Sequence, residues 1–146
     1  MTYAINVVRT ARQHTAVIKT SATLATVGDV VGASIGKVSA TLEKKKLEPI
    51  GAPFCRTLEF KDGNMKLEIG FPIASALKSQ EGDVQPSELA AGEVATTKHV
   101  GSQDESVKAY EAIHAWAQKN GRNPGGAPWE VYASETAMEI FFPLSP

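Results

Sequence analysis

Residues 67–73 read Leu-Glu-Ile-Gly-Phe-Pro-Ile, and residues 138–144 read Met-Glu-Ile-Phe-Phe-Pro-Leu. A second pair recurs in the same order, as Gly-Ala-Pro-Phe at 51–54 and Gly-Ala-Pro-Trp at 126–129. Two copies of one supersecondary unit are expected to pack as a pseudo-symmetric pair, and the seam between packed elements commonly holds a ligand. The sequence therefore predicts an internal duplication with pseudo-twofold symmetry and a central cleft.

Each copy is predicted to be a strand, a helix and two strands, because period-2 and helical spacings alternate in that order. The first copy, about residues 3–73, is expected to hold strands at 3–9 and 15–20, a helix, and strands at 54–60 and 66–73. Its helix carries one apolar stripe, formed by Val31, Ile35, Val38 and Leu42, and should end before Pro49. Thr26 is expected to cap the helix, and Asp62-Gly63 to form the hairpin turn.

The second copy, about residues 93–144, repeats this order. It is expected to hold a strand at 93–100, a helix, and strands at 129–133 and 138–144. The helix has a stripe of Val107, Tyr110, Ile113 and Ala117, opens at a Ser-x-x-Glu capping box at 102–105 and ends near Gly121. Residues 75–92 are polar and are predicted to be a linker. We expect one domain over residues 1–146, with an α+β fold in which antiparallel sheets carry both helices on one side.

Composition excludes several classes of protein. The 15 basic and 16 acidic residues give a net charge of −1, so no strong field attracts nucleic acid or anionic lipid. The single cysteine, Cys55, excludes an internal disulfide and is typical of a reducing compartment. No apolar run approaches the length of a membrane span, and the N-terminus lacks a signal-peptide pattern. The expected location is the cytoplasm.

Alternation along the last strand of each copy separates two faces. Met138 and Ile140 should face the helix, and Glu139 and Phe141 should face away from it. Glu68 occupies the position of Glu139 in the first copy. Either both glutamates point into water, as outward residues of half-buried strands usually do, or Glu139 lies in a cleft with aromatic walls. In a cleft, the carboxylate would attract a cationic or hydrogen-bond-donating organic ligand or act as an acid/base.

Four aromatic residues are candidates for the walls of this cleft: Trp129, Tyr132, Phe141 and Tyr110. Trp129 and Tyr132 fall on opposite faces of one strand, so only one of them can line the cleft. Tyr110 belongs to the helix stripe and is more often a core residue. A cationic ligand stacked on such a ring gains about 0.5–2 kcal/mol.

Motifs for other chemistry are missing from the sequence. The three histidines show no metal-ligand spacing, and no phosphate loop, dinucleotide fingerprint or nucleophile elbow occurs. We therefore expect neither a metal nor a cofactor.

The same repeated segments, together with Ala95–Gly101, Ala109–Ile113 and the closing Glu139–Leu144, resemble the GyrI-like small-molecule-binding family. The resemblance covers about residues 3–144. It implies a duplicated fold with a ligand cleft on the pseudo-twofold axis, in which the acidic residue of the last strand, here Glu139, is the central group. Relatives include effector domains of multidrug-responsive transcription regulators, stand-alone proteins that protect gyrase or sequester toxins, and hydrolases of cyclopropane-bearing compounds.

Two departures from the family pattern stand out. Residues 101–104 read Gly-Ser-Gln-Asp where relatives commonly have Gly-Pro-Tyr-Asp, and the segment 133–138 is shorter than usual. The shorter segment is expected to leave one end of the cleft more open.

Three hypotheses follow. The first is a stand-alone cytoplasmic protein that binds or sequesters a small aromatic or cationic compound through Glu139, without direct nucleic-acid or membrane binding. The second is a hydrolase of cyclopropane-type electrophiles, in which Glu139, alone or with Tyr132 or Glu130, activates water or protonates a leaving group. The third is a protein-binding, gyrase-inhibitor-like factor, which the near-neutral charge does not favour.

Overall fold

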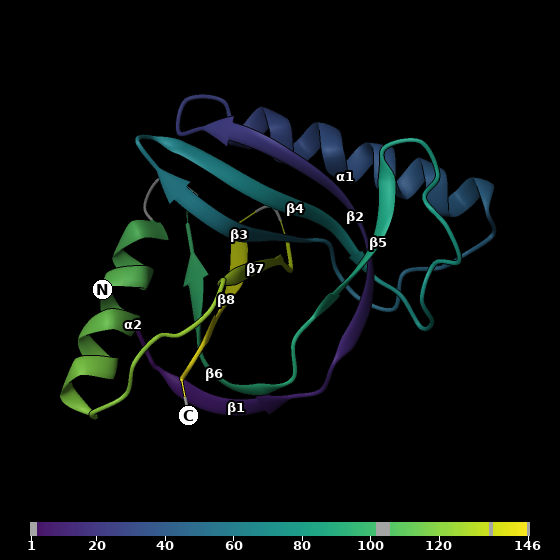
Figure 1. The fold of residues 1–146 in the computed structure, drawn as a ribbon. Coiled ribbons are helices and arrows are strands. Elements are labelled where there is room, and N and C mark those ends of the chain that lie inside the picture. The colour runs from purple at the N-terminus through teal and green to yellow at the C-terminus, as the bar shows by residue number, and fades with distance from the viewer. Residues whose placement is uncertain (1–2, 102–105, 135, 146) are drawn as a thin grey trace. The chain divides into compact units, whose positions relative to one another are not determined.

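The structure is a computed structural model that describes residues 3–101, 106–134 and 136–145. The chain divides into two compact units. The first-repeat unit is Arg12–Ala90, and the second-repeat unit combines Met1–Ala11 with Ala91–Pro146. Each unit contains strands and one helix, as the sequence predicts for an α+β fold (Figure 1).

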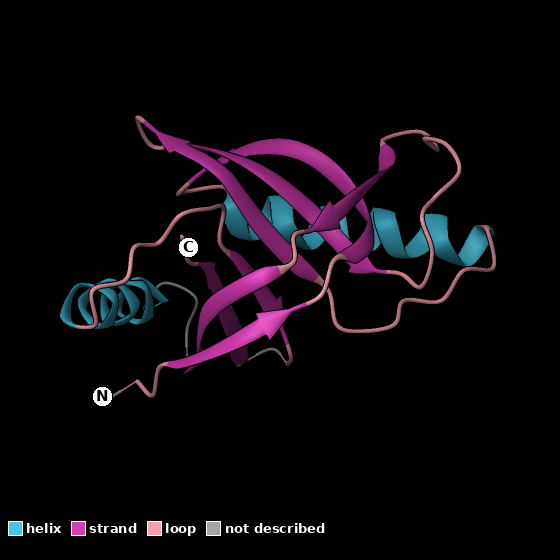
Figure 2. Cartoon of the chain, turned by 60° about the horizontal axis from the view of Figure 1, so that its bottom comes forward, coloured by secondary structure: helices cyan, strands magenta, loops and turns pink. Residues whose placement is uncertain are grey.

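The first-repeat unit is an antiparallel sheet with a helix on one face (Figure 2). Its elements are β2 (Gln13–Thr23), α1 (Val27–Lys44), β3 (Phe54–Lys61), β4 (Asn64–Pro72) and β5 (Val84–Leu89). The strand order is β3-β4-β2-β5. The core between sheet and helix consists of apolar residues from all these layers, namely Ala16, Ile18, Val38, Leu42, Ile73, Leu77 and Val84, with Phe71 beside them.

The second-repeat unit has the same arrangement. Its elements are β1 (Asn6–Thr10), β6 (Gly92–Val100), α2 (Ser106–Lys119), β7 (Trp129–Tyr132) and β8 (Ala137–Pro143). The order β7-β8-β6-β1 matches β3-β4-β2-β5 strand for strand. Its core consists of Ala95, Ala109, Ile113, Met138 and Ile140. The strand–helix–strand–strand duplication is therefore confirmed, whereas the pseudo-twofold axis and the central cleft stay predictions.

Local sequence signals explain where several elements begin and end. Asp62 and Gly63 have φ angles of 52° and 77°, which is the tight hairpin turn that Asp-Gly favours. α2 ends at Lys119, and Gly121 follows with φ 66°. The amide of Arg122 then donates to the carbonyl of Ala117, at 2.8 Å, and closes the helix end.

Gly70 is required by a close approach of two strands. A Cβ at this position would overlap the carbonyl oxygen of Ala16 and lie 2.8 Å from its carbonyl carbon. Because β2 pairs with β4 at this point, only a residue without a side chain keeps the two strands in register. Gly70 is therefore explained by the close packing of two backbones.

Two expectations about strands were wrong. The segment 3–9 was expected to belong to the first copy, but β1 pairs with β6 and completes the sheet of the second-repeat unit. The segment 75–92 was expected to be a linker, but it contains β5, which pairs with β2. β5 and β1 thus occupy equivalent outer positions in the two units, although β5 follows its repeat in the chain and β1 comes before both repeats.

Two details of the helices also differ. Thr26 stands at the N-cap of α1 but makes no side-chain capping bond there, because its Oγ1 accepts a hydrogen bond from the amide of Thr23. Val107 is 56% exposed and does not belong to the buried stripe of α2, which Ala109, Ile113 and Ala117 form. The capping box at 102–105 lies outside the described residues. Among the described residues, no helix is long and apolar enough to cross a membrane.

Candidate functional site

The two faces of β8 have different environments, as alternation predicts. Met138 and Ile140 are buried in the core beneath α2. Glu139 and Phe141 point to the opposite face and are half-buried. Glu139 is therefore neither a core residue nor an ordinary exposed residue of an outward strand face.

A pocket of about 290 Å³ lies in the second-repeat unit, and Glu139 is part of its wall. The other lining residues come from β1, the segment before it, and β6: Tyr3, Ala4, Asn6, Thr96, Thr97 and Lys98. Asn6 and Thr96 are direct cross-strand partners, and so are Lys98 and Glu139. The pocket thus lies across three adjacent strands and combines one carboxylate, one ammonium group and several neutral polar groups.

The carboxylate of Glu139 makes no hydrogen bond or ion pair with any other residue in the described part of the chain. The same holds for the ammonium group of Lys98. Since the exposed Lys98 and the half-buried Glu139 both line the same pocket, their charged groups are available to a molecule that enters it.

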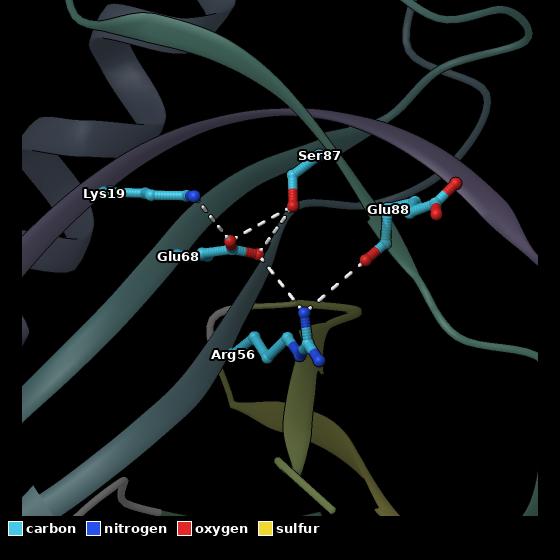
Figure 3. A network of polar contacts seen from close by, with 5 residues as sticks. All are labelled: Lys19, Arg56, Glu68, Ser87 and Glu88. Atoms are coloured by element: carbon cyan, nitrogen blue, oxygen red, sulfur yellow. Dashed lines mark hydrogen bonds and ion pairs between the residues drawn. The ribbon is translucent and has the colours of Figure 1, made fainter.

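Glu68, the counterpart of Glu139 in the first-repeat unit, has the opposite environment (Figure 3). Its residue is only 4% exposed. Ser87 Oγ donates to both carboxylate oxygens, at 3.0 and 3.1 Å, Arg56 Nη1 lies 3.5 Å from Oε1, and Lys19 Nζ lies 3.7 Å from Oε2. This carboxylate is neutralised within its own unit.

The register of the two sheets makes this comparison direct. Lys19 is the cross-strand partner of Glu68, as Lys98 is of Glu139. On the other side, Arg56 is opposite Glu68, but Val131 is opposite Glu139. The two units therefore share the acid and the lysine, and the second-repeat unit lacks the guanidinium group that would engage the acid.

The position equivalent to Ser87 in the second-repeat unit also holds an apolar residue. It pairs with Thr15, which in turn is opposite Pro72. At the equivalent place in the second-repeat unit, Val8 pairs with Val94, which is opposite Pro143. A valine thus stands where the hydroxyl donor stands in the other unit, and Glu139 loses a second partner.

Trp129 and Phe141 share the face of the sheet on which Glu139 lies. They are cross-strand partners, and their rings stack with centroids 5.3 Å apart and planes 8° apart. Trp129 is 5% exposed, whereas Phe141 is half-buried. Both rings lie on the same sheet face as the carboxylate, but neither lines the pocket, whose aromatic lining residue is Tyr3.

Tyr110, Glu130 and Tyr132 form a separate cluster on the side of α2. Tyr110 and Tyr132 donate to the two oxygens of Glu130, at 2.7 and 3.0 Å, and both rings pack against the core beneath α2. The structure therefore brings these three predicted site residues together with one another, but on the opposite face of the sheet from Glu139.

The sequence reasoning did not single out Tyr3, Asn6, Thr96 or Lys98. Asn6 and Tyr3 come from the segment that was assigned to the first copy, so their proximity to Glu139 was not visible. Lys98 could have been identified from the sequence. When the two repeats are aligned on their first strands and on their Glu-Ile dipeptides, Lys98 takes the position of Lys19. No group of three or more potential metal ligands occurs among the described residues.

The family profile of the GyrI-like small-molecule-binding domain matches residues 4–145. The chain belongs to this family. Solved structures agree with the fold of this GyrI-like chain. The crystal structure of the EcmrR C-terminal domain has a TM-score of 0.79 and 20% identity and covers 99% of both chains. In an EcmrR–DNA complex the TM-score is 0.84 at 20% identity, and the match covers 98% of this chain but 57% of EcmrR.

Two further structures are similar to the GyrI-like chain. A hydrolase from Listeria innocua has a TM-score of 0.73 and 13% identity, over 97% of this chain and 91% of that one. SAV2435 bound to tetraphenylphosphonium has a TM-score of 0.60 and 15% identity, over 99% and 94%. At these identities the likeness establishes the fold alone. No curated protein sequence matches the chain significantly.

Proposed function

We propose that this GyrI-like domain binds a small organic compound carrying a cationic or hydrogen-bond-donating group, and that Glu139 recognises that group. The observation that carries the proposal is the contrast between the two glutamates. Glu68 is held by Arg56, Ser87 and Lys19, whereas Glu139 lines a pocket without a partner among the described residues. A half-buried carboxylate without a partner gains by binding a donor, because charge-assisted hydrogen bonds are about twice as strong as neutral ones.

The aromatic neighbours support the same function. The stacked rings of Trp129 and Phe141 lie on the sheet face of Glu139. The half-buried Phe141 offers a ring to a ligand that extends along the strand from Glu139. The tetraphenylphosphonium complex of SAV2435 is a precedent for an organic cation in this fold. We place the protein in the cytoplasm, where it would act as an effector-binding or sequestering protein.

The substitution Glu139→Gln tests the proposal because it removes the charge and keeps the shape. We expect the affinity for a small organic cation, measured by isothermal titration calorimetry with benzyltrimethylammonium and with 2-phenylethylammonium, which also donates hydrogen bonds, to fall at least about tenfold because the attraction between opposite charges is lost. The melting temperature should stay nearly unchanged, since no described residue depends on this carboxylate.

The matched control is Glu130→Gln. Glu130 is also a half-buried glutamate of the second-repeat unit, but it lies on the side of α2 and is engaged by two tyrosines. This variant should keep its affinity for the cation. Equal affinities of the Glu139→Gln variant and the unchanged protein would contradict the proposal.

A second candidate is hydrolysis of a cyclopropane-type electrophile. The similarity to the Listeria innocua hydrolase favours it, together with the accessible carboxylate of Glu139, which could act as an acid/base. Tyr132 and Glu130 lie on the other face of the sheet, so Glu139 would have to act without them. Hydrolysis is established if the protein turns over such a compound and the Glu139→Gln variant does not. If the compound binds but is not turned over, the protein only binds its ligand.

A further inference from the structure

We infer that the ligand of the Glu139 pocket is a small zwitterion, whose ammonium group binds Glu139 and whose carboxylate or other anionic group binds Lys98. The inference rests on the proposed function and adds the chemical class of the ligand. It starts from a difference between two equivalent Lys–Glu pairs, of which one forms an ion pair and the other does not.

In the first-repeat unit, the lysine and the glutamate interact with each other. Lys19 Nζ lies 3.7 Å from Glu68 Oε2, at directly opposite positions of β2 and β4. In the second-repeat unit, Lys98 and Glu139 occupy the same opposite positions of β6 and β8 but form no ion pair. Both instead line the 290 Å³ pocket. The pocket therefore presents two opposite charges that are not engaged with each other.

The spacing of the two charges suits a short zwitterion. Side chains at directly opposite positions of an antiparallel pair have Cβ atoms about 4.5–5.5 Å apart. Lys98 and Glu139 start from such positions, so both side chains can reach a ligand whose two charges are a few bonds apart. Amino acids with their ammonium and carboxylate groups on the same or on nearby carbons meet this requirement.

Lys98 also makes a simple monocation a weaker ligand than a zwitterion. A lone cation bound at Glu139 would lie beside the ammonium group of Lys98, and like charges in a pocket repel each other. Because one acidic and one basic residue, Glu139 and Lys98, line the pocket, its charges are balanced toward a ligand with no net charge. Lys98 is thus a specificity-determining residue beside the acid.

The remaining wall fits a polar ligand of modest size. Asn6 and Thr96 lie side by side on adjacent strands and supply an amide and a hydroxyl group. Small-molecule pockets span roughly 300–1,000 Å³, and the 290 Å³ of this pocket is just below that range. A small ligand with several hydrogen-bonding groups uses this wall better than a large apolar one.

The test uses matched sets of probes on the full chain. Glycine, β-alanine, 4-aminobutyrate and phenylalanine are each compared with their methyl esters, which keep only the cation, and their N-acetyl derivatives, which keep only the anion. Calorimetry should show that at least one amino acid binds about tenfold or more tightly than both of its derivatives. The variant Lys98→Gln should remove the advantage of the amino acid over its ester, and Glu139→Gln its advantage over the N-acetyl compound.

Lys19→Gln is the matched control, because Lys19 has the equivalent position in the first-repeat unit but does not line the pocket. It should leave the affinities unchanged. Esters that bind as tightly as the parent amino acids, a Lys98→Gln variant with an unchanged preference, or no binding of any amino acid would overturn the inference. If the esters or benzyltrimethylammonium bind and Glu139→Gln weakens that binding, the proposed function stands even where the zwitterion inference fails. If none of the probes binds the protein, both the proposed function and the inference are wrong.

Discussion

At the scale of single residues, the two glutamates show how neighbours decide the role of one side chain. Both follow the same alternation, in segments that read Glu-Ile and then Phe-Pro two residues later. Arg56 and Ser87 make Glu68 a buried structural group, and Val131 and Val8 at the equivalent places leave Glu139 without those partners. The two repeats thus have the same strand positions but give the carboxylate different neighbours.

A stability measurement distinguishes the two roles. Glu68→Gln should lower the free energy of unfolding by about 1.5–3 kcal/mol, because it weakens hydrogen bonds to a charged acceptor in a buried place. Glu139→Gln should change it by less than about 0.5 kcal/mol. Urea denaturation of both variants measures the difference, and equal losses of stability would contradict the assignment of Glu68 as the structural member.

At the scale of elements, α2 is held by few large side chains. Ile113 is fully buried between the helix and the sheet, with the small Ala109 and Ala117 on either side of it along the helix. Ile113 is therefore the large side chain that this helix buries fully, whereas its Tyr110 and Trp116 are only partly buried against the same core.

Ile113→Ala should destabilise the protein by about 2–5 kcal/mol, through lost burial and the cavity left behind. Val107→Ala is the matched control on the same helix. Because Val107 is 56% exposed, this substitution should lower the free energy of unfolding by less than about 0.5 kcal/mol. Thermal unfolding followed by circular dichroism compares them. A large loss from Val107→Ala would show that the helix buries a different stripe.

The sequence predicted most elements because their signals are local. Strand alternation separated Met138 and Ile140 from Glu139, and Asp62-Gly63 marked its hairpin turn. β5 was missed because it reads Val-Gln-Pro-Ser-Glu-Leu, which has little apolar alternation and a proline that is tolerated only in an outer strand. Val107 was misplaced because its spacing fits the stripe, although it stands one residue inside the start of α2.

The candidate site was predicted only in part, because its composition depends on pairing between distant segments. Glu139 could be identified from its place in the repeat. Its surroundings could not, since Asn6 reaches the pocket only through the pairing of β1 with β6. No local pattern in the sequence specifies that pairing.

At the scale of the whole molecule, each sheet is completed by a strand from outside its strand–helix–strand–strand repeat. β5 follows directly after the first repeat, while β1 belongs to the second-repeat unit but begins the chain. The first-repeat unit is therefore continuous in sequence, and the second-repeat unit is not.

Removal of residues 1–11 should act on one unit. β6 would lose its outer partner, so its amides should exchange hydrogen for deuterium much faster, while β2 and β4 should keep their protection. The pocket would lose Tyr3, Ala4 and Asn6 as well, and ligand binding should disappear. Hydrogen-exchange mass spectrometry reads both sheets in one experiment, and equally fast exchange in β2 and β6 would contradict this division.

The place of β1 in the chain has a consequence for biosynthesis. Because translation proceeds from the N-terminus, β1 leaves the ribosome before β6 has been made, and the continuous first-repeat unit is completed in between. Throughout that interval, Val7 and Val8 belong to a nascent strand without a partner. On a polysome, where several unfinished copies lie close together, an early strand of one copy meets the late strands of another, so strand exchange between molecules is the characteristic assembly error of this topology.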